Sequence, residues 1–374
     1  MYTFKKVSQS QIPWKTIEGA LDSTCFHSEK WNNYLKKIGI KPYVIEILQD
    51  DIIIGYFIGE KLGLGIYIIT APIEGIGTYT QGLCMLDVIS EEERVNIYQD
   101  LAKWLFENKE ALLLQVDDWQ LRRTSAIWIP YEEFRQDVLD KKGIAYSVRP
   151  TLCVPVNTSE EEMWKNLHYK SCKYCINKAK KLGLQVKEIT NYDDIEEFTK
   201  IHYAQLKEVC AKQGMRPKPS QQQKRMKALC ESLYPERLIM LEVIGKDDNG
   251  VEQVMSTGIY GLDKGQCIYW TGASYQRYQK YCPNELMVWE AMRLAHQRGG
   301  GILNFGGMAT YKLKVAGLER DLPICPVNEH LDIAAFVIFG DVELTQACAA
   351  ELIKKMPPHD VMITAESKGI PLIH

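Results

Sequence analysis

Short apolar runs, broken by polar pairs and glycines, dominate the first part of the chain. The runs at residues 43–48, 52–58 and 65–69 are rich in Ile and Tyr, and Asp50-Asp51 separates the first two. This pattern predicts strands joined by turns in an antiparallel meander. Ser90 precedes three glutamates in a capping box, and apolar residues follow at helical spacing: Val95, Ile97, Leu101, Trp104 and Leu105. We therefore expect a helix after Ser90, followed by a strand at 111–116.

The second part of the chain predicts the same order of elements. Strands are expected near 238–244, 254–260 and 267–271, then a helix at 285–297 capped by Asn284, and a short strand at 302–305. The segments NIYQDLAKWLFENKEALLLQVDD and NELMVWEAMRLAHQRGGGILNFGG both predict helix, break and strand. This favours an internal duplication over a chance recurrence of a common order. We place the domain boundary so that residues 1–150 and 151–374 form the two domains.

Bulk composition excludes several classes of protein. With 374 residues, of which 46% are hydrophobic, the chain is long enough for two domains with their own cores. No apolar stretch has the length of a signal peptide or a membrane span, so we expect a cytoplasmic protein without a membrane span. Eleven cysteines at irregular spacings suggest reduced thiols rather than disulfides. A net charge of -3 gives no global reason to bind nucleic acid, and we expect no DNA partner.

A lysine-rich segment at 165–187 contains seven lysines and no acidic residue. It predicts a helix with one cationic side and one packed side. The residues that can lie on the packed side are Trp164, Leu167, Ser171, Cys175, Ala179 and Leu182. The cationic side is either a solvated face or a site for the phosphates of a nucleotide, coenzyme A or RNA. His168, Cys172 and Cys175 superficially suggest a metal. No second C-x-x-C or His pair has ligand spacing, so we expect packing cysteines and no metal site.

Unusual residues are densest between 269 and 314. Gly306 and Gly307 follow a predicted strand, which indicates either a turn with positive φ or a close approach of a ligand to the backbone. Tyr311 and Lys314 lie just beyond. Acyl transfer to an amine needs proton transfer and stabilisation of an oxyanion, and Tyr and Lys suit both tasks. No G-x-S-x-G elbow or phosphate-binding P-loop is present. Asp117-Asp118 could bind a metal or cap a helix, and capping is favoured.

These segments resemble the FemABX peptidyltransferases and their GNAT acetyltransferase relatives. KYCINKAKKLGLQV, at 173–186, resembles the R-x-x-I-R-K-A-x-x-x-G-ϕ-x-V helix, where ϕ is apolar. PNELMVWEAMRLA, GGILNFGG and YKLK follow in the family order of a helix, a DFGG-like strand end and a Y-x-F-K element. Lys173 and Asn177 replace arginines, and Asn304 replaces an aspartate. Residues 274–284 lack the usual glycines of the Q/R-x-x-G-x-G/A pyrophosphate loop, so coenzyme A would have to bind differently.

The resemblance implies an α/β (α+β) fold of two tandem GNAT-like domains, each a mixed, mostly antiparallel sheet flanked by helices. It implies an N-acyltransferase acting by direct attack of an amine, with acyl-coenzyme A as co-substrate and no tightly bound cofactor. The acceptor would be a cell-envelope or polysaccharide precursor. Two alternatives remain: transfer from aminoacyl-tRNA to a peptidoglycan precursor, which the absence of an inserted coiled-coil arm disfavours, and a non-catalytic binding protein.

Site residues are assigned on the same basis. The catalytic candidates are Lys314, in place of the motif lysine, and Tyr311. The candidates for donor binding are Lys173, Asn177, Lys178, Gly306 and Gly307. The candidates for acceptor binding are Gly77, Thr78 and Tyr79 of the first, degenerate domain and Tyr275 of the second. We expect the lysine-rich segment and the Tyr311/Lys314 pair to line one shared pocket.

Overall fold

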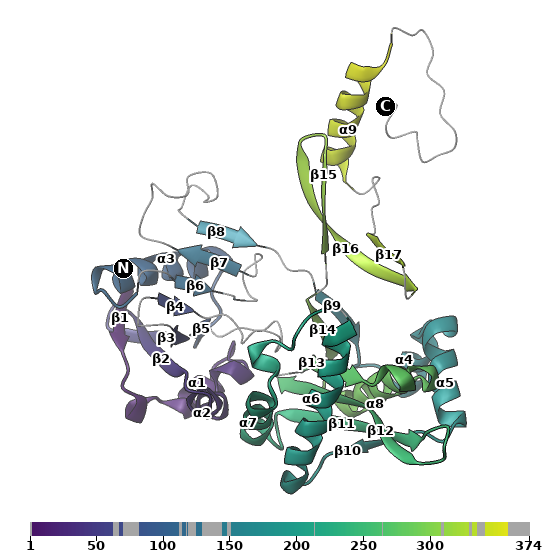
Figure 1. The fold of residues 1–374 in the computed structure, drawn as a ribbon. Helices are drawn as coiled ribbons and strands as arrows, with labels where there is room; N and C mark the ends of the chain where they lie inside the picture. The colour runs from purple at the N-terminus through teal and green to yellow at the C-terminus, as the bar shows by residue number, and fades with distance from the viewer. Residues whose placement is uncertain are drawn as a thin grey trace. The chain divides into compact units, whose positions relative to one another are not determined.

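The chain forms two compact units, Met1–Gly307 and Met308–His374 (Figure 1). This computed structural model describes residues 2–62, 67–69, 82–111, 114–116, 118, 125–128, 144–147, 151–212, 214–263, 265–307, 310–328, 331–334 and 341–357. Within the described ranges, no helix is both long and apolar enough to cross a bilayer.

The first sheet of the larger unit contains eight strands among the described residues: β1 (Tyr2–Lys6), β2 (Lys41–Gln49), β3 (Ile52–Leu62), β4 (Tyr67–Ile69), β5 (Gly82–Met85), β6 (Leu114–Val116), β7 (Ser125–Trp128) and β8 (Ile144–Ser147). Their order is β1-β2-β3-β4-β6-β7-β8, and β5 pairs with β3. All the pairs are antiparallel except β4 with β6. The predicted antiparallel strands at 43–48 and 52–58 are confirmed.

Helices cover both faces of this sheet because its strand residues alternate. Phe57 points to the face under α3 (Glu91–Glu107), whereas Tyr56 and Ile58 pack with Ile17 of α1 (Trp14–Gly19). The hydroxyl of Ser90 accepts a hydrogen bond from the Glu93 amide at 3.1 Å, which confirms the predicted N-cap of α3.

The second sheet of this unit has the order β10-β11-β12-β13-β14-β9. Its strands are β9 (Thr151–Pro155), β10 (Gln185–Glu188), β11 (Leu238–Lys246), β12 (Glu252–Asp263), β13 (Gln266–Ser274) and β14 (Ile302–Gly307). Only β13 and β14 pair in parallel among the described strands of this sheet. Helix α8 (Pro283–Gln297) connects these two strands, as the sequence predicts, but the predicted cap is wrong: Cys282 occupies the N-cap position, and Asn284 lies inside the first turn.

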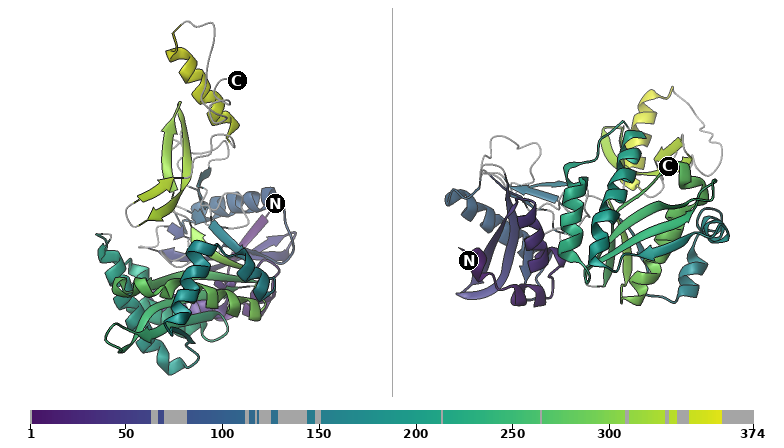
Figure 2. Two further views of the ribbon diagram at one scale, coloured as in Figure 1. Left: turned by 90° about the vertical axis from the view of Figure 1, so that its right-hand side faces the viewer. Right: turned by 60° about the horizontal axis from the view of Figure 1, so that its bottom comes forward.

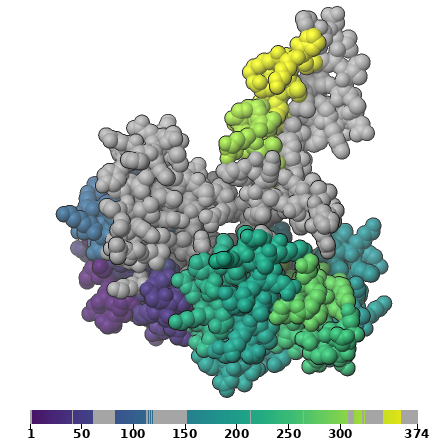
Figure 3. Space-filling view, viewed as in Figure 1, coloured from purple at the N-terminus to yellow at the C-terminus, as the bar shows by residue number. Residues whose placement is uncertain are grey.

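Alternating residues of β11 separate the two hydrophobic faces of the second sheet. Ile239, Leu241 and Val243 pack with α8 and α5 (Tyr174–Lys181). Leu238 and Met240 pack with α6 (Ile195–Lys212) and α7 (Gln223–Leu233). Figure 2 shows helices on both faces of this sheet, and in the space-filling view the teal and green residues of this half form a continuous surface (Figure 3).

The two sheets of the larger unit are joined by a common hydrophobic core. Trp31, Tyr34 and Leu35 of α2 (Glu29–Lys37) pack in one buried cluster with Leu229 and Leu233 of α7. Burial of such large side chains on both elements stabilises their association by the hydrophobic effect. The elements before residue 150 are therefore held against those after it through α2.

The predicted helix over 165–187 is wrong in extent. Helix α4 (Glu160–Asn166) ends before His168, whose ring accepts a hydrogen bond from the Ser171 amide. A π-helical turn, Tyr169–Lys173, then leads into α5. Gly183, at φ 76°, ends α5, because this left-handed conformation favours glycine. Leu182, expected on the packed side, is instead 48% exposed, and Lys187 lies in β10.

Both sheets repeat one arrangement of helix and parallel strands. Helix α3 precedes β6, which pairs in parallel with β4, and α8 precedes β14, which pairs in parallel with β13. Leu114 and Ile302 hold equivalent places in these two ladders. This equivalence matches the duplicated helix-break-strand pattern and confirms the predicted fold class. The exact division into residues 1–150 and 151–374 stays a prediction.

The smaller unit contains β15 (Thr310–Val315), β16 (Leu318–Asn328), β17 (Leu331–Ala334) and α9 (Val342–Lys355). The three strands form an antiparallel sheet in chain order. Arg320 of β16 holds the start of α9, since its guanidinium lies 2.6 Å from both the Asp341 and Glu343 carboxylates.

Candidate active site

Strands β13 and β14 separate toward their carboxyl ends. They pair only from Gln266 with Ile302 to Ile268 with Asn304, although β13 continues to Ser274 and β14 to Gly307. In open α/β sheets, ligands bind beyond the carboxyl ends of parallel strands, where neighbouring strands part. This separation is the part of the second sheet best placed to admit a substrate.

Aromatic and polar groups line this separation. Tyr269, the first residue of β13 beyond the ladder, lies with its ring 6.0 Å from that of Phe305 on β14. Burial raises the pKa of Tyr269 to about 12, so its hydroxyl stays protonated at neutral pH. The Asn304 side chain accepts a hydrogen bond from the Gly306 amide at 2.8 Å.

Gly306 adopts φ 79°, which confirms the predicted turn with positive φ. A residue with a side chain is strained in this conformation, so glycine is required there. The ladder between β14 and β9 shifts register between Asn304 and Gly307. Gly306 therefore forms a bulge that bends the strand end beside the separation.

Helix α8 begins without a glycine-rich loop. A 3-10 helix, Gln276–Tyr281, precedes it, and Cys282 occupies the N-cap position at φ 60°. Tyr275, a predicted acceptor residue, is half-buried, and the Arg277 guanidinium lies 4.1 Å from its ring centroid. The backbone of Gln276 donates to Glu208 of α6 at 2.7 Å. This start of α8 is held by aromatic and charged contacts.

The predicted donor residues of the lysine-rich segment lie on and beside α5. Lys173 donates from Nζ to the Lys165 carbonyl at 2.9 Å and is half-buried. Asn177 is exposed, and Lys178 is half-buried. Helix α5 packs against α8 through the hydrophobic core that both share. The structure therefore brings this cationic segment to α8, the helix that follows the separating strand β13.

The predicted catalytic residues belong to the smaller unit. Lys314 of β15 is 75% exposed, and its Nζ lies 2.9 Å from a carboxylate oxygen of Glu319 on β16. Tyr311 lies on the same strand. The acceptor candidates Gly77, Thr78 and Tyr79 fall outside the described residues. The expectation that Tyr311, Lys314 and the lysine-rich segment line one pocket stays a prediction.

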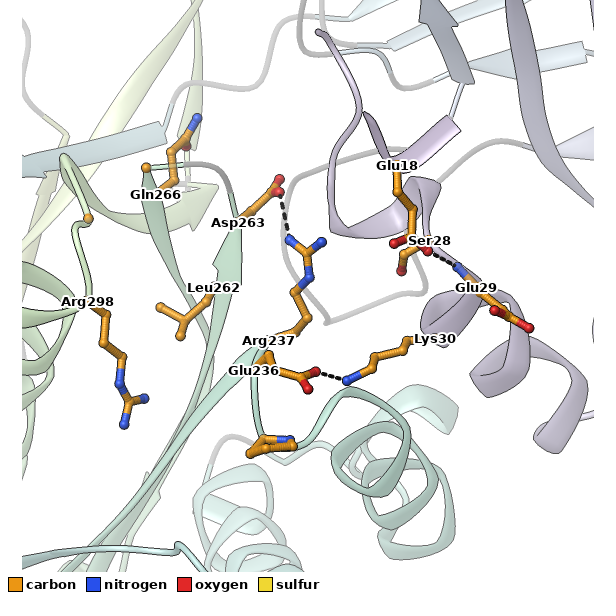
Figure 4. Close-up of a pocket in the computed structure, with 13 residues that line it drawn as sticks. Glu18, Ser28, Glu29, Lys30, Glu236, Arg237, Leu262, Asp263, Gln266 and Arg298 are labelled. Atoms are coloured by element: carbon orange, nitrogen blue, oxygen red, sulfur yellow. Dashed lines mark hydrogen bonds and ion pairs between the residues drawn. The ribbon is translucent and has the colours of Figure 1, made fainter. Parts of the chain in front are cut away.

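A pocket that the sequence analysis did not anticipate lies between α2 and the start of β13 (Figure 4). Its volume is about 920 Å³, and it is lined by Glu18, Ser28, Glu29, Lys30, Pro235, Glu236, Arg237, Leu262, Asp263, Gly265, Gln266, Arg298 and Gly300. Gln266 begins β13, and Gly300 precedes β14. The pocket therefore lies at the opposite end of the parallel pair from the separation.

Cations from both halves of the larger unit meet in this pocket. Lys30 of α2 pairs with Glu236, and Arg237 lies 3.9 Å from Asp263. Burial lowers the pKa of Lys30, and the nearby positive charge of Arg237 lowers it further. Carboxylates of Glu18, Glu29, Glu236 and Asp263 share the lining with these cations and Arg298, so the pocket carries mixed charge and no net positive charge. No motif in the sequence connects α2 with the loop after α7, so the sequence analysis could not predict this pocket.

Three potential metal ligands meet where α5 contacts the start of α8. The sulfur atoms of Cys175 and Cys282 and a carboxylate oxygen of Glu285 all lie within 4.8 Å of one another. Burial raises the pKa of the Cys175 thiol to about 12, helped by hydrogen bonds with Cys282 and Glu285. The C-x-x-C partner, Cys172, instead lies near Ser171.

Asp118 has a structural role, and its predicted helix capping stays a prediction because residues 119–124 lie outside the described part of the chain. Its carboxylate is buried and accepts hydrogen bonds from Arg94 at 2.8 Å and Tyr98 at 2.5 Å. Arg94 also pairs with Asp22. Buried charges need partners of this kind.

The comparisons with known proteins agree with this fold. Residues 167–313 match the family model described as Acetyltransferase (GNAT) domain. The solved structure of FemX is similar, with a TM-score of 0.55 and 12% identity over 82% of this chain and 88% of FemX. A conserved protein of unknown function from Bacteroides thetaiotaomicron has a TM-score of 0.48 and 10% identity, with 82% and 90% of the two chains covered. No curated protein matches the sequence.

The resemblance to the FemABX and GNAT group is thus confirmed by two independent findings. The family model covers most of the lysine-rich segment, α8 and the first part of β15, and it ends at residue 313, just before Lys314. The likeness to FemX extends the shared fold over both sheets and not only the second. Residues 167–313 thus match the model of a GNAT acetyltransferase domain, within a chain that has the fold of FemX.

Proposed function

We propose that this protein is an N-acyltransferase that moves an acyl group from acyl-coenzyme A to an amine, by direct attack of the amine on the donor carbonyl. The match of residues 167–313 to the GNAT domain carries the proposal. The separation of β13 and β14 supports it, because it leaves room for a donor at the carboxyl ends of two parallel strands.

The donor would bind along α8 and the end of β14. Lys173, Asn177 and Lys178 would meet its phosphates, and the backbone at Gly306 and Gly307 would approach its acyl arm. Gly306 supports this role because it has no side chain at its positive φ that would keep a donor away from the backbone. Aminoacyl-tRNA is the second candidate donor, and the fold shared with FemX favours it.

Transfer would depend on Lys314 and Tyr311 beside the reacting carbonyl. Lys314 would supply positive charge to the tetrahedral oxygen, and Tyr311 would donate a hydrogen bond or pass a proton. The ion pair of Lys314 with Glu319 is largely exposed, so its exchange for a substrate contact costs little. No covalent intermediate on the enzyme is needed in this scheme.

The acceptor would be a precursor of the cell envelope or of a polysaccharide, and the protein would act in the cytoplasm. Gly77, Thr78, Tyr79 and Tyr275 would contact its amine-bearing end. The pocket beside Lys30 and Arg237 would hold a polar part of the acceptor remote from that amine, because it lies at the other end of the parallel pair and is lined by both carboxylates and cations. An extended, polar acceptor fits this division.

Binding of donors to the whole protein tests the proposal first. We expect calorimetry to detect acetyl-coenzyme A binding, and Lys178→Ala to weaken it. If the protein binds aminoacyl-tRNA and does not bind acetyl-coenzyme A, aminoacyl-tRNA would be the donor. Binding of neither would favour a non-catalytic protein and contradict the proposal.

Transfer to a panel of amines then tests the catalytic assignment. Lys314→Ala is expected to lower kcat at least tenfold, which corresponds to about 1.4 kcal/mol of transition-state stabilisation. Lys312→Ala, two residues earlier on β15, is the matched control and should keep wild-type kcat. Equal activity of Lys314→Ala and wild type would remove Lys314 from the mechanism.

A further inference from the structure

The three donor atoms of Cys175, Cys282 and Glu285 come from two packed helices. Cys175 lies on α5, Cys282 occupies the N-cap position of α8, and Glu285 lies in the first turn of α8. Ile176 of α5 and Leu286 of α8, the neighbours of two of these residues, are buried in the same core. The contact between the helices therefore positions the donors before any ligand binds.

The set of donors is that of a borderline-soft divalent cation. Two thiolates and one carboxylate are ligands typical of Zn²⁺, and thiolates disfavour Mg²⁺ and Ca²⁺. In a tetrahedral zinc site the metal lies about 2.3 Å from sulfur, which puts two sulfurs about 3.8 Å apart. Donors already within 4.8 Å of one another reach that geometry through small side-chain movements.

The surroundings of the donors also suit a cation. Cys282 is 8% exposed, whereas Cys175 and Glu285 are half-buried, so a cation has access from one side and protein on the other. Both thiols are free, without a disulfide.

We propose that Cys175, Cys282 and Glu285 form a zinc site that ties α5 to the first turn of α8. Three protein ligands leave a fourth coordination position for a water molecule. The site does not depend on the proposed acyl transfer. The alternative is a disulfide between Cys175 and Cys282, in which Glu285 would have no role.

Cobalt substitution tests this proposal on the full-length protein. After removal of metal with a chelator, addition of Co²⁺ should produce the visible bands of tetrahedral cobalt and a near-ultraviolet thiolate-to-cobalt band, saturating at one ion per chain. Zn²⁺ should then bleach these bands. Zn²⁺ should also raise the melting temperature of the metal-free protein.

Variants separate this site from the other cysteines of the segment. Cys175→Ser and Cys282→Ser should each abolish the thiolate band, and Glu285→Gln should weaken Co²⁺ binding at least tenfold. Cys172→Ser is the matched control: it lies three residues before Cys175 but outside the cluster, and it should bind Co²⁺ like wild type. Circular dichroism checks that each variant is folded. If a cysteine variant does not fold, Co²⁺ binding by Glu285→Gln still tests the site.

Three results would overturn the zinc site. The first is no thiolate band in the metal-free wild type. The second is a band that survives Cys282→Ser or disappears with Cys172→Ser. The third is peptide mapping that finds Cys175 bonded to Cys282 in protein purified without reductant, which would assign the pair to a disulfide.

Discussion

Acid should destabilise this protein through one buried histidine. His202 of α6 is fully buried between the helix and the second sheet. Its Nδ1 lies 2.8 Å from the Thr257 hydroxyl, and its Nε2 lies 3.1 Å from the Thr271 hydroxyl. Thr257 donates its proton to the Gln205 side chain at 2.6 Å, so its oxygen accepts from His202 Nδ1–H. The imidazole is therefore held neutral, with both nitrogens hydrogen-bonded.

Burial lowers the pKa of His202 from 6.5 to about 3. Between these values the unfolded chain binds a proton that the native protein refuses, so the free energy of unfolding falls as the pH falls. Each pH unit below 6.5 costs up to about 1.4 kcal/mol, which gives about 2 kcal/mol lost by about pH 5. The loss ends near the folded-state pKa.

Chemical denaturation at about pH 7 and pH 5 measures this loss. His202→Gln, which cannot titrate, should lose about 2 kcal/mol less than wild type between the two pH values. Thr271→Val is the control, because it removes one hydrogen bond but keeps the imidazole, and it should retain the wild-type pH dependence. Equal losses in wild type and His202→Gln would refute the reasoning.

Three further substitutions probe other buried features. Arg94→Met leaves the Asp118 carboxylate buried without its cation, so it should cost about 3–5 kcal/mol in denaturant unfolding. In Gly261→Ala the new Cβ would lie 2.4 Å from the ring of buried Trp270; a loss of about 1–3 kcal/mol and an altered near-ultraviolet circular dichroism spectrum are expected. Burial raises the pKa of Glu60 to about 8. The contribution of the protonated Glu60 to the free energy of unfolding is therefore complete below about pH 4.5 and is lost as the pH rises through 8. Glu60→Gln does not titrate, so denaturation at a series of pH values should show it gaining stability over wild type across that range.

Local signals in the sequence predicted most elements of the fold. Ser90 with Glu93 marked the start of α3, and the glycines at 299–301 marked the end of α8, because caps and stops depend on neighbouring residues. The lysine-rich segment was predicted poorly. Its helical spacing continues through Leu167 and Leu182, but a side-chain cap at His168 and a left-handed Gly183 interrupt the helix. Spacing of apolar residues does not register such interruptions.

The site residues also differ in whether their positions depend on local sequence or on long-range packing. The positive φ of Gly306 follows from a glycine at a strand end, so the sequence revealed it. Lys30 and Arg237, or Cys175 and Cys282, lie far apart in the chain and meet only because α2 packs beside α7 and α5 beside α8. Convergence of this kind depends on helix packing, which no short motif in a single sequence encodes. A search along the chain for ligand spacing therefore considered Cys175 only with Cys172 and His168, and could not group it with Cys282 and Glu285. Its structural partners became visible only once α5 and α8 were packed together.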